Sequence, residues 1–165
     1  MSREIRRAGM EDLNDLTDIY SRARAFMAAN GNPTQWGNTT PSIEMIMADI
    51  DSAGYVVVED GVITGAFYFM TDAHEPAYDS IEGAWLNDKP YAVVHRCAVR
   101  ESSKGVGQFI MDWCFNLSGN IRIDTHKRNT PMKNLLGKNG FVYCGTVMYD
   151  KIDGERVAYQ RYSGM

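Results

Sequence analysis

The second half of the chain alternates between strand-like and helix-like apolar patterns, and this alternation constrains the fold more than any other feature. β-branched and aromatic runs predict strands, and apolar residues at helical spacing that end at Gly119 and Gly140 predict helices. The expected elements are strand 91–99, helix 106–118, strand 121–125, helix 131–138 and strand 141–148. This order predicts an α/β fold (α+β in its mixed sheet), with a central mixed β-sheet flanked by helices and a short βαβ-type crossover at its centre.

The first half contributes two amphipathic helices and a hairpin. We expect the chain to open with a helix over 11–29, followed by a Gly- and Pro-rich loop over 30–37 that carries Trp36. Thr40 and Pro41 predict the N-cap and first turn of a second helix, with Ile46 and Ile50 on its apolar face. The remaining expected elements are a hairpin of strands 55–59 and 62–70, and a last strand 155–162 after a turn at Asp153-Gly154.

Composition and charge exclude several classes of protein. The chain has 165 residues, of which 44% are hydrophobic, and no repeat or linker, so we expect a single domain over 1–165. A net charge of −4 is the wrong sign for general binding to nucleic acid. No apolar run approaches the roughly 20 residues of a membrane span, and no apolar segment follows the charged N-terminus, so we expect no membrane association and a cytoplasmic location.

The three cysteines do not form a metal or redox motif. Cys97, Cys114 and Cys144 are far apart and odd in number, and no Cys-x-x-Cys spacing is present. We therefore expect reduced, mostly buried thiols and no metal site.

A glycine-rich segment joins the predicted strand 91–99 to helix 106–118 and carries the strongest chemical signal. Small residues and the free N–H groups of a helix start favour an anion such as a phosphate. The segment lacks both the third glycine of a dinucleotide fingerprint and a Walker motif. Taken alone, a glycine-rich turn that only caps a helix explains it equally well.

The flanking segments extend this signal to nearly the whole chain. They are Val94-His-Arg-Cys-Ala-Val99, Lys104-Gly-Val-Gly-Gln-Phe-Ile-Met-Asp112, Asp124-Thr-His-Lys-Arg-Asn129 and Met132-Lys-Asn-Leu-Leu-Gly-Lys-Asn-Gly-Phe141. Together with the two leading helices and the Trp36 loop, they resemble the core of the GNAT family of acyl-CoA N-acyltransferases. The resemblance implies a GNAT domain that uses acetyl-CoA as co-substrate.

The resemblance also implies where acetyl-CoA binds. The pyrophosphate is expected at 103–108 and the pantetheine arm beside the start of the last helix. The implied cofactor-binding residues are Cys97, Ala98, Val99, Ser103, Lys104, Gly105, Val106, Gly107, Gln108, Asn129 and Met132. Two positions depart from the family pattern: Ser102 replaces a Gln or Arg, and Leu136 replaces the tyrosine that protonates the leaving thiolate.

Catalysis by attack of an amine requires a base and an oxyanion donor. Strand alternation predicts His95, Cys97 and Val99 on one face, and the resemblance implies His95 as the base and the Val99 backbone N–H as the oxyanion donor. His126 is a second candidate base, and either histidine has a purely structural alternative. Tyr143, Cys144 and Tyr149 are the candidate donors to the thiolate in place of Leu136.

The acceptor side is less defined by sequence. Glu82 and Asp79 are candidates for binding the cation of the acceptor, and Trp36, Tyr78 and Trp85 for walling its site, although ordinary packing or solvation explains each of them as well. The function implied is N-acetylation of a primary amine, on a small molecule or a peptide. The alternative is a non-catalytic acyl-CoA sensor or a structural GNAT-like domain. A homodimer through an edge near residues 150–154 is also expected.

Overall fold

The computed structural model describes residues 2–101, 103–149 and 154–164 and contains one mixed sheet flanked by helices. The helices are α1 (Leu13–Ala29), α2 (Ile43–Ser52), α3 (Val106–Ser118) and α4 (Thr130–Lys138), with 3-10 turns at Met10–Asp12 and Pro76–Ser80. The strands are β1 (Arg3–Arg7), β2 (Gly54–Glu59), β3 (Val62–Met70), β4 (Glu82–Gly83), β5 (Ala92–Val99), β6 (Asn120–Thr125), β7 (Val142–Met148) and β8 (Glu155–Tyr162). Their order in the sheet is β1-β2-β3-β5-β6-β8-β7-β4. The expected fold class is confirmed.

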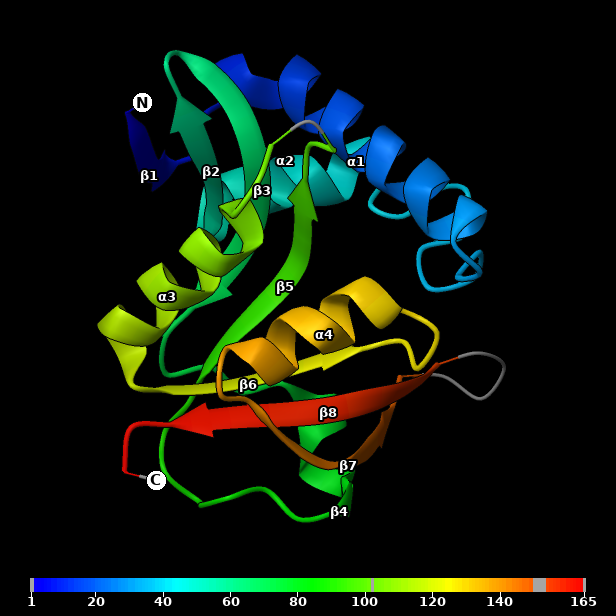
Figure 1. The fold of residues 1–165 in the computed structure, drawn as a ribbon, viewed down its shortest axis with the longest axis vertical. Helices are drawn as coiled ribbons and strands as arrows, with labels where there is room; N and C mark the ends of the chain where they lie inside the picture. The colour runs from blue at the N-terminus through cyan, green and yellow to red at the C-terminus, as the bar shows by residue number, and fades with distance from the viewer. Residues whose placement is uncertain (1, 102, 150–153, 165) are drawn as a thin grey trace.

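Strands β5 and β6 diverge in the middle of the sheet. Among the described strands, only this neighbouring pair is parallel, and its pairing stops after Ala92↔Ile121 and Val93↔Arg122. Figure 1 shows β5 continuing away from β6 past this point. The two strands therefore form a V, with free backbone edges facing each other.

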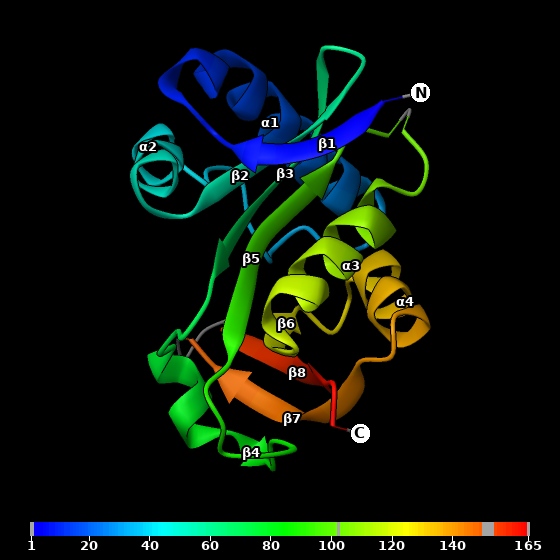
Figure 2. The ribbon, with the colours of Figure 1, turned by 90° about the vertical axis from the view of Figure 1, so that its left-hand side faces the viewer.

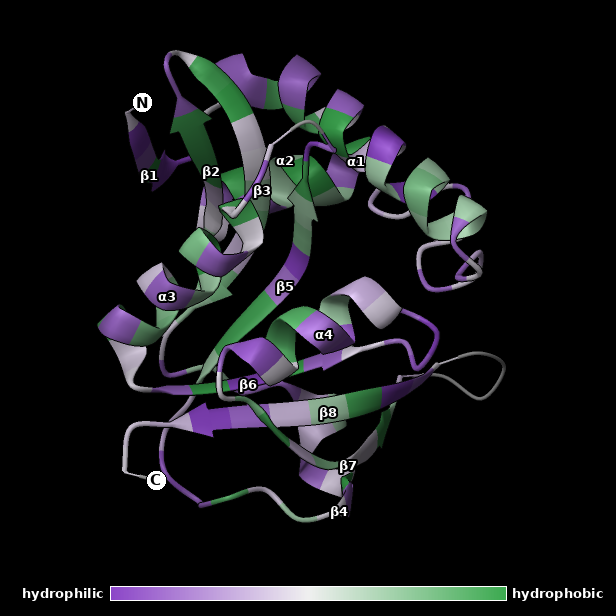
Figure 3. Cartoon of the chain, viewed as in Figure 1, coloured by the Kyte–Doolittle hydropathy of each residue, from purple (hydrophilic) through white to green (hydrophobic). Residues whose placement is uncertain are grey.

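Helices cover both faces of the sheet. Figure 2 shows α1 and α2 on one face and α3 and α4 on the other. Neighbouring residues of β2 pack on opposite faces of the sheet: Val57 packs in the cluster beneath α3, and Val56 packs in the cluster beneath α1 and α2. This alternation is what a strand buried on both faces requires. The last turns of α1 are apolar in Figure 3, and Phe26 and Met27 border the cavities described below.

Three expectations about the elements are wrong. The chain opens with strand β1, which was missed because Ile5 is the lone apolar residue among four charged ones at the sheet edge. Helix α2 is capped by Ser42, whose Oγ accepts from the Met45 N–H at 3.2 Å, so Thr40 and Pro41 precede the helix. No element was expected between strands 62–70 and 91–99, but this segment holds the 3-10 turn Pro76–Ser80 and β4.

Some expectations concern residues at the limits of the described chain. Ser102 and most of the turn at 150–154 lie outside the described residues. β4 pairs with β7 at Glu82↔Thr146 and Gly83↔Gly145, so part of the edge expected to receive a second copy is already covered.

Cys97, Cys114 and Cys144 are free thiols, as expected, and Cys97 is the least buried of them. No helix among the described residues is long and apolar enough to cross a membrane.

Candidate active site

Two adjoining cavities lie where β5 and β6 diverge. The first, which we call the His95 cavity, has a volume of about 490 Å³, and the second, the Ser103 cavity, about 340 Å³. They share Met27, Cys97, Asn129 and Met132. The His95 cavity opens beside the segment 73–75 and the start of β8, whereas the Ser103 cavity lies between α1, the end of β5 and the start of α4.

A β-bulge in β5 separates the two cavities. Tyr68 pairs with His95 and Ala66 with Ala98, so two residues of β5, Arg96 and Cys97, oppose Phe67. Arg96 adopts φ +49°, a left-handed conformation that costs a non-glycine residue about 1–3 kcal/mol. The bulge reverses the alternation, so the expectation that His95, Cys97 and Val99 share a face is wrong.

The bulge therefore directs the side chains of His95 and Cys97 to opposite faces of the sheet. Cys97 and Val99 pack with the α3 cluster, while His95 follows Val93 on the face of Tyr78 and Tyr91. His95 lines only the first cavity, Val99 lines only the second, and Cys97 borders both.

The strained Arg96 is held at three points. Its guanidinium makes a bidentate ion pair with Asp49 of α2 at 2.7 and 2.8 Å and lies over the Tyr68 ring at 5.0 Å. Its carbonyl accepts a hydrogen bond from the buried Tyr20 hydroxyl at 2.8 Å. Burial raises the pKa of Tyr20, so this hydroxyl stays protonated and donates. Side chains of α1, α2 and β3 thereby fix the bulge.

His95 is paired with a carboxylate inside its cavity. The Nε2 atom lies 3.5 Å from Oε2 of Glu75, and the two side chains are 18% and 24% exposed. The hydrogen bond to His95 lowers the pKa of Glu75, which keeps the carboxylate charged. A carboxylate beside Nε2 favours the proton on that nitrogen and leaves Nδ1 as the basic atom of the neutral ring. The Glu75 carboxylate therefore orients the imidazole of His95 within the cavity.

A second carboxylate, Asp124 at the end of β6, lines the same cavity. Its Oδ2 accepts from the hydroxyls of Tyr78 and Tyr149, each at 2.6 Å. Burial and the charge of Asp124 raise the pKa of both tyrosines, so both hydroxyls remain donors. Tyr149 lines the cavity, whereas Tyr143 and Cys144 line neither cavity.

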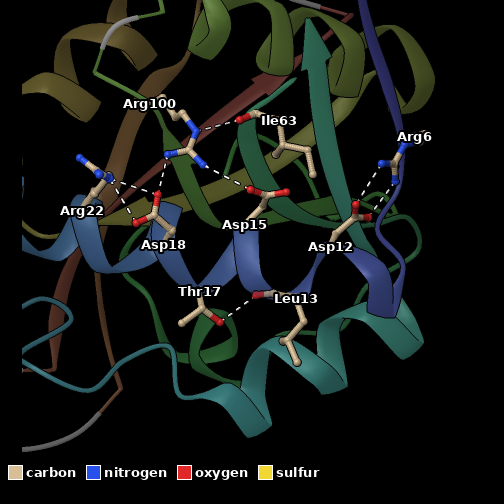
Figure 4. Close-up of polar contacts among 9 residues, drawn as sticks. All are labelled: Arg6, Asp12, Leu13, Asp15, Thr17, Asp18, Arg22, Ile63 and Arg100. Atoms are coloured by element: carbon tan, nitrogen blue, oxygen red, sulfur yellow. Dashed lines mark hydrogen bonds and ion pairs between the residues drawn. The ribbon is translucent and has the colours of Figure 1, made fainter. Parts of the chain in front are cut away.

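The segment after β5 is tied to α1 and β3 through Arg100. Its side chain donates to the Ile63 carbonyl at 2.9 Å and to Asp18 at 2.8 Å, and Arg22 also donates to Asp18 (Figure 4). Arg22 and Arg100 both line the Ser103 cavity, where they place positive charge. The pairing with Asp18 fixes both side chains at the cavity wall.

The backbone of β5 presents an N–H group to the opening between the strands. The Arg100 N–H donates to the Thr64 carbonyl at 2.9 Å, on the β3 side. Successive residues of a strand direct their N–H groups to alternate edges, so the N–H of Val99 points to the other edge, which β6 has left. This geometry provides a fixed donor beside the Ser103 cavity.

The structure brings several of the sequence-predicted residues together. Trp36 and His95 line the first cavity; Ala98, Val99 and Ser103 line the second; and Cys97, Asn129 and Met132 line both. The Asn129 side chain caps α4 by accepting from the Met132 N–H at 3.2 Å.

Other predicted residues lie away from the two cavities. On the acceptor side these are Tyr78 and Trp85, which pack in a core cluster, and Glu82, which is exposed in β4. On the loop side they are Lys104, Gly105, Val106, Gly107 and Gln108, which line neither cavity. His126 is 2% exposed, and its Nδ1 accepts from the Arg128 N–H at 3.1 Å, which is a structural contact.

The glycines of the loop have distinct local roles. Gly105 precedes α3 with φ +75°, a conformation that favours glycine. Gly107 faces α4: a Cβ atom there would lie 2.9 Å from Cδ2 of Leu135. The second glycine is therefore required by close packing of the two helices.

Sequence reasoning missed Glu75, Asp124 and the Arg96–Asp49 pair. Arg96 and Asp124 lie in flanking segments that resemble the family, but the sequence assigned them no role, and Glu75 and Asp49 lie outside those flanking segments. No group of three or more His, Cys, Asp or Glu residues among those described is arranged to hold a metal ion.

Comparison with known proteins identifies the family. No protein-family model and no curated protein matches the chain. Among solved structures, a GNAT family acetyltransferase from Streptococcus agalactiae is 31% identical, with 97% of this chain and 95% of that chain covered and a TM-score of 0.87. A GNAT family acetyltransferase from Listeria monocytogenes is 19% identical over 96% and 94% of the two chains, with a TM-score of 0.69.

A third structure shows the same fold at lower identity. A phosphinothricin acetyltransferase from Sinorhizobium meliloti, in complex with acetyl-CoA, is 14% identical over 98% of this chain and 88% of that chain, with a TM-score of 0.67. The first match, which spans nearly the full length of both chains, confirms the resemblance seen in the sequence. The chain belongs to the GNAT family of acetyltransferases.

Proposed function

We propose that this protein is an acetyl-CoA-dependent N-acetyltransferase, in which a primary amine attacks the thioester directly. The observation that carries the proposal is the His95–Glu75 pair in a cavity that adjoins the Ser103 cavity through Cys97 and Met132. A base on one side of the bulge and a donor site on the other allow amine and thioester to meet without a covalent enzyme intermediate.

Acetyl-CoA is assigned to the Ser103 cavity. The cavity wall is largely apolar, which suits a pantetheine arm beside Met132 and Asn129. Residues 103–108 would receive the pyrophosphate at the start of α3, where free N–H groups favour anions. The Sinorhizobium enzyme, which has the same fold, was solved in complex with acetyl-CoA, and this supports acetyl-CoA as the ligand.

His95 is assigned the removal of the proton from the amine. An alkylammonium group has a pKa of about 10.4, so nitrogen must lose a proton before or during attack. Nδ1 of His95, or a water bound to it, accepts that proton. The Val99 N–H then stabilises the negative charge that develops on the thioester oxygen.

Departure of the thiolate needs little help. A thiol has a pKa of about 8.5, so its anion is a tolerable leaving group. Leu136 is fully buried and supplies no acid. Tyr149, whose pKa is raised by burial and Asp124, is a weak acid for this purpose. We therefore assign no residue to protonation of the thiolate.

The experiment is an acceptor screen. Release of free CoA thiol from acetyl-CoA is measured with a panel of small amines and peptides, acetylated products are identified by mass spectrometry, and acetyl-CoA binding is measured in parallel. The proposal expects amine-dependent release with a stoichiometric N-acetyl product. Acetyl-CoA binding without turnover of any amine supports the alternative, an acyl-CoA sensor, which the leucine at position 136 favours.

A further inference from the structure

His95 and Asp124 face each other across the divergence of β5 and β6. The last parallel pair is Val93↔Arg122, and each of the two residues lies two positions beyond it on its own strand. Two positions along a strand return to the same face, and both side chains line the His95 cavity. Tyr78, which belongs to the core cluster on this face, reaches Asp124 with its hydroxyl. The proposed base and a carboxylate thus stand on opposite sides of one opening.

One oxygen of the Asp124 carboxylate is open to a further hydrogen bond. Both tyrosine hydroxyls donate to Oδ2, and in residues 2–101, 103–149 and 154–164 no hydrogen bond reaches Oδ1 and no cationic nitrogen lies within 4.0 Å of the carboxylate. A carboxylate oxygen has room for two hydrogen bonds. A half-buried anion without a cation is unfavourable, and a bound ammonium ion relieves it.

Other charged side chains of this cavity already have partners. Arg96 is held by Asp49 through two hydrogen bonds, and Glu75 lies against His95. Arg156 donates to the backbone carbonyls of Gln35 and Glu155. Asp124 is therefore the carboxylate best placed to receive a cation from the acceptor.

We propose that Asp124 binds the ammonium group of the acceptor through Oδ1, so that this enzyme takes a protonated alkylamine in preference to a neutral arylamine. This inference rests on the proposed function. Tyr78 and Tyr149 fix the carboxylate, and the ammonium nitrogen then lies between Asp124 and His95. One N–H bond breaks and its proton passes to His95, and the freed lone pair forms a bond to the thioester carbon. The C–S bond then breaks, and the departing CoA thiolate takes up the second proton that the nitrogen loses.

The binding test uses two probes of equal size, tert-butylammonium, which is charged, and tert-butanol, which is neutral. Each is titrated into the full chain, and backbone amide shifts near Thr125 are followed by NMR. We expect the cation to bind about 10- to 100-fold more tightly than the alcohol, as a charge-assisted hydrogen bond implies. Equal affinity of the two probes for the native chain overturns the inference.

Asp124→Asn is the matched variant, because asparagine keeps an oxygen for the tyrosine hydroxyls and loses the charge. It should remove the preference for tert-butylammonium and leave acetyl-CoA binding unchanged. Asp79→Asn removes an exposed carboxylate that lines neither cavity and should keep the preference. An Asp124→Asn protein that binds the cation as the native chain does also overturns the inference.

Turnover separates this inference from the proposed function. Benzylamine is protonated at pH 7 and aniline is neutral, so Asp124→Asn should raise KM for benzylamine about 10- to 100-fold and leave KM for aniline nearly unchanged. Cation binding that depends on Asp124, without turnover of any amine, supports the subsite and contradicts the proposed function. Turnover of benzylamine with an unchanged KM in Asp124→Asn supports the proposed function and contradicts the subsite.

Discussion

The two adjoining cavities are built in different ways. The Ser103 cavity takes much of its wall from one continuous segment, residues 97–103 excluding position 102, and from the start of α4. The His95 cavity draws on residues from Met27 to Arg156, and ion pairs and hydrogen bonds hold many of them. A backbone fixed by secondary structure shapes the first, whereas side chains from distant segments shape the second. The proposed donor site therefore depends mainly on the backbone, and the proposed acceptor site depends mainly on side chains.

The border between the two cavities is the bulge at Arg96. Without the extra residue, His95 and Cys97 would project to the same face. The proposed base would then lie on the side of the Ser103 cavity, where the thioester is proposed to bind. With the extra residue, the proposed base His95 projects toward the proposed acceptor site, while the Val99 N–H remains at the strand edge. This difference can be tested by variants that affect one cavity and leave the other intact.

Replacing His95 by glutamine has the largest expected effect. The variant keeps a hydrogen-bonding side chain beside Glu75 and loses the basic nitrogen, so kcat should fall by about 10²–10⁴. Acetyl-CoA affinity should not change, because His95 does not line the Ser103 cavity. Steady-state kinetics and acetyl-CoA titration measure the two quantities. A kcat within a few-fold of the native value, with an unmoved acid limb of the pH profile, would assign His95 a structural role.

Gly107→Glu affects the opposite cavity. The new side chain requires the Leu135 side chain to shift and adds a negative charge at the start of α3, so acetyl-CoA affinity should fall about 100-fold or more. Gly137→Glu is the matched control, since no atom lies within 4 Å of a Cβ built at that helical glycine. The control should bind acetyl-CoA normally. Equal affinities of the two folded variants would exclude the loop as the pyrophosphate site.

The Ser103 cavity was largely predictable from sequence, because one continuous segment forms much of its wall. A contiguous run predicts strand, glycine turn and helix together, and α3 begins and ends at the expected residues 106 and 118. The identity of Gly107 was predicted to matter for a phosphate, whereas the structure shows that it contacts Leu135. The glycine pattern indicated that position 107 matters, but only the structure shows that a side chain there would contact Leu135 of α4.

The acceptor side was predicted poorly. Glu75 and Asp124 line the same cavity as the proposed base, yet they are 49 positions apart in the sequence. Tyr78 and Trp85 were expected at its wall but pack in the core, because large aromatic residues are more often buried than functional. The bulge also escaped prediction, since strand alternation assumes a regular strand.

Asp49→Asn tests whether the bulge depends on its ion pair. The variant leaves the guanidinium of Arg96 without a carboxylate, and the loss should be about 3 kcal/mol, the lower end for buried pairs, because the two side chains are 21% and 15% exposed. Release of Arg96 also loosens His95, so kcat should fall while acetyl-CoA affinity stays the same. Urea unfolding and kinetics test both effects. A stable variant with native kcat would show that Tyr20 and β3 suffice to hold the bulge.

The smallest effect is expected from a carboxylate that belongs to neither cavity. Asp12 is 5% exposed at its side chain and accepts from Arg6 at 2.8 and 3.0 Å and from the Gly9 N–H at 2.8 Å (Figure 4). Asp12→Asn keeps the cap to Gly9 and removes the charge. The loss should be about 1–2 kcal/mol, a reduced value because Arg6 remains 42% exposed. Both kcat and acetyl-CoA affinity should be unchanged.

The pH dependence of that loss identifies its cause. The hydrogen bond from Arg6 lowers the pKa of Asp12 below its ordinary value of about 3.9. A carboxyl whose pKa is lowered by folding stabilises the native state above the unfolded pKa, and this contribution disappears as pH falls through the folded pKa. The gap in unfolding free energy between native and Asp12→Asn proteins should therefore be constant from pH 7 to about 5 and close below about pH 4. A gap that persists after the Asp12 carboxyl of the native protein has been protonated, as followed by NMR titration, would assign the effect to packing at the start of α1.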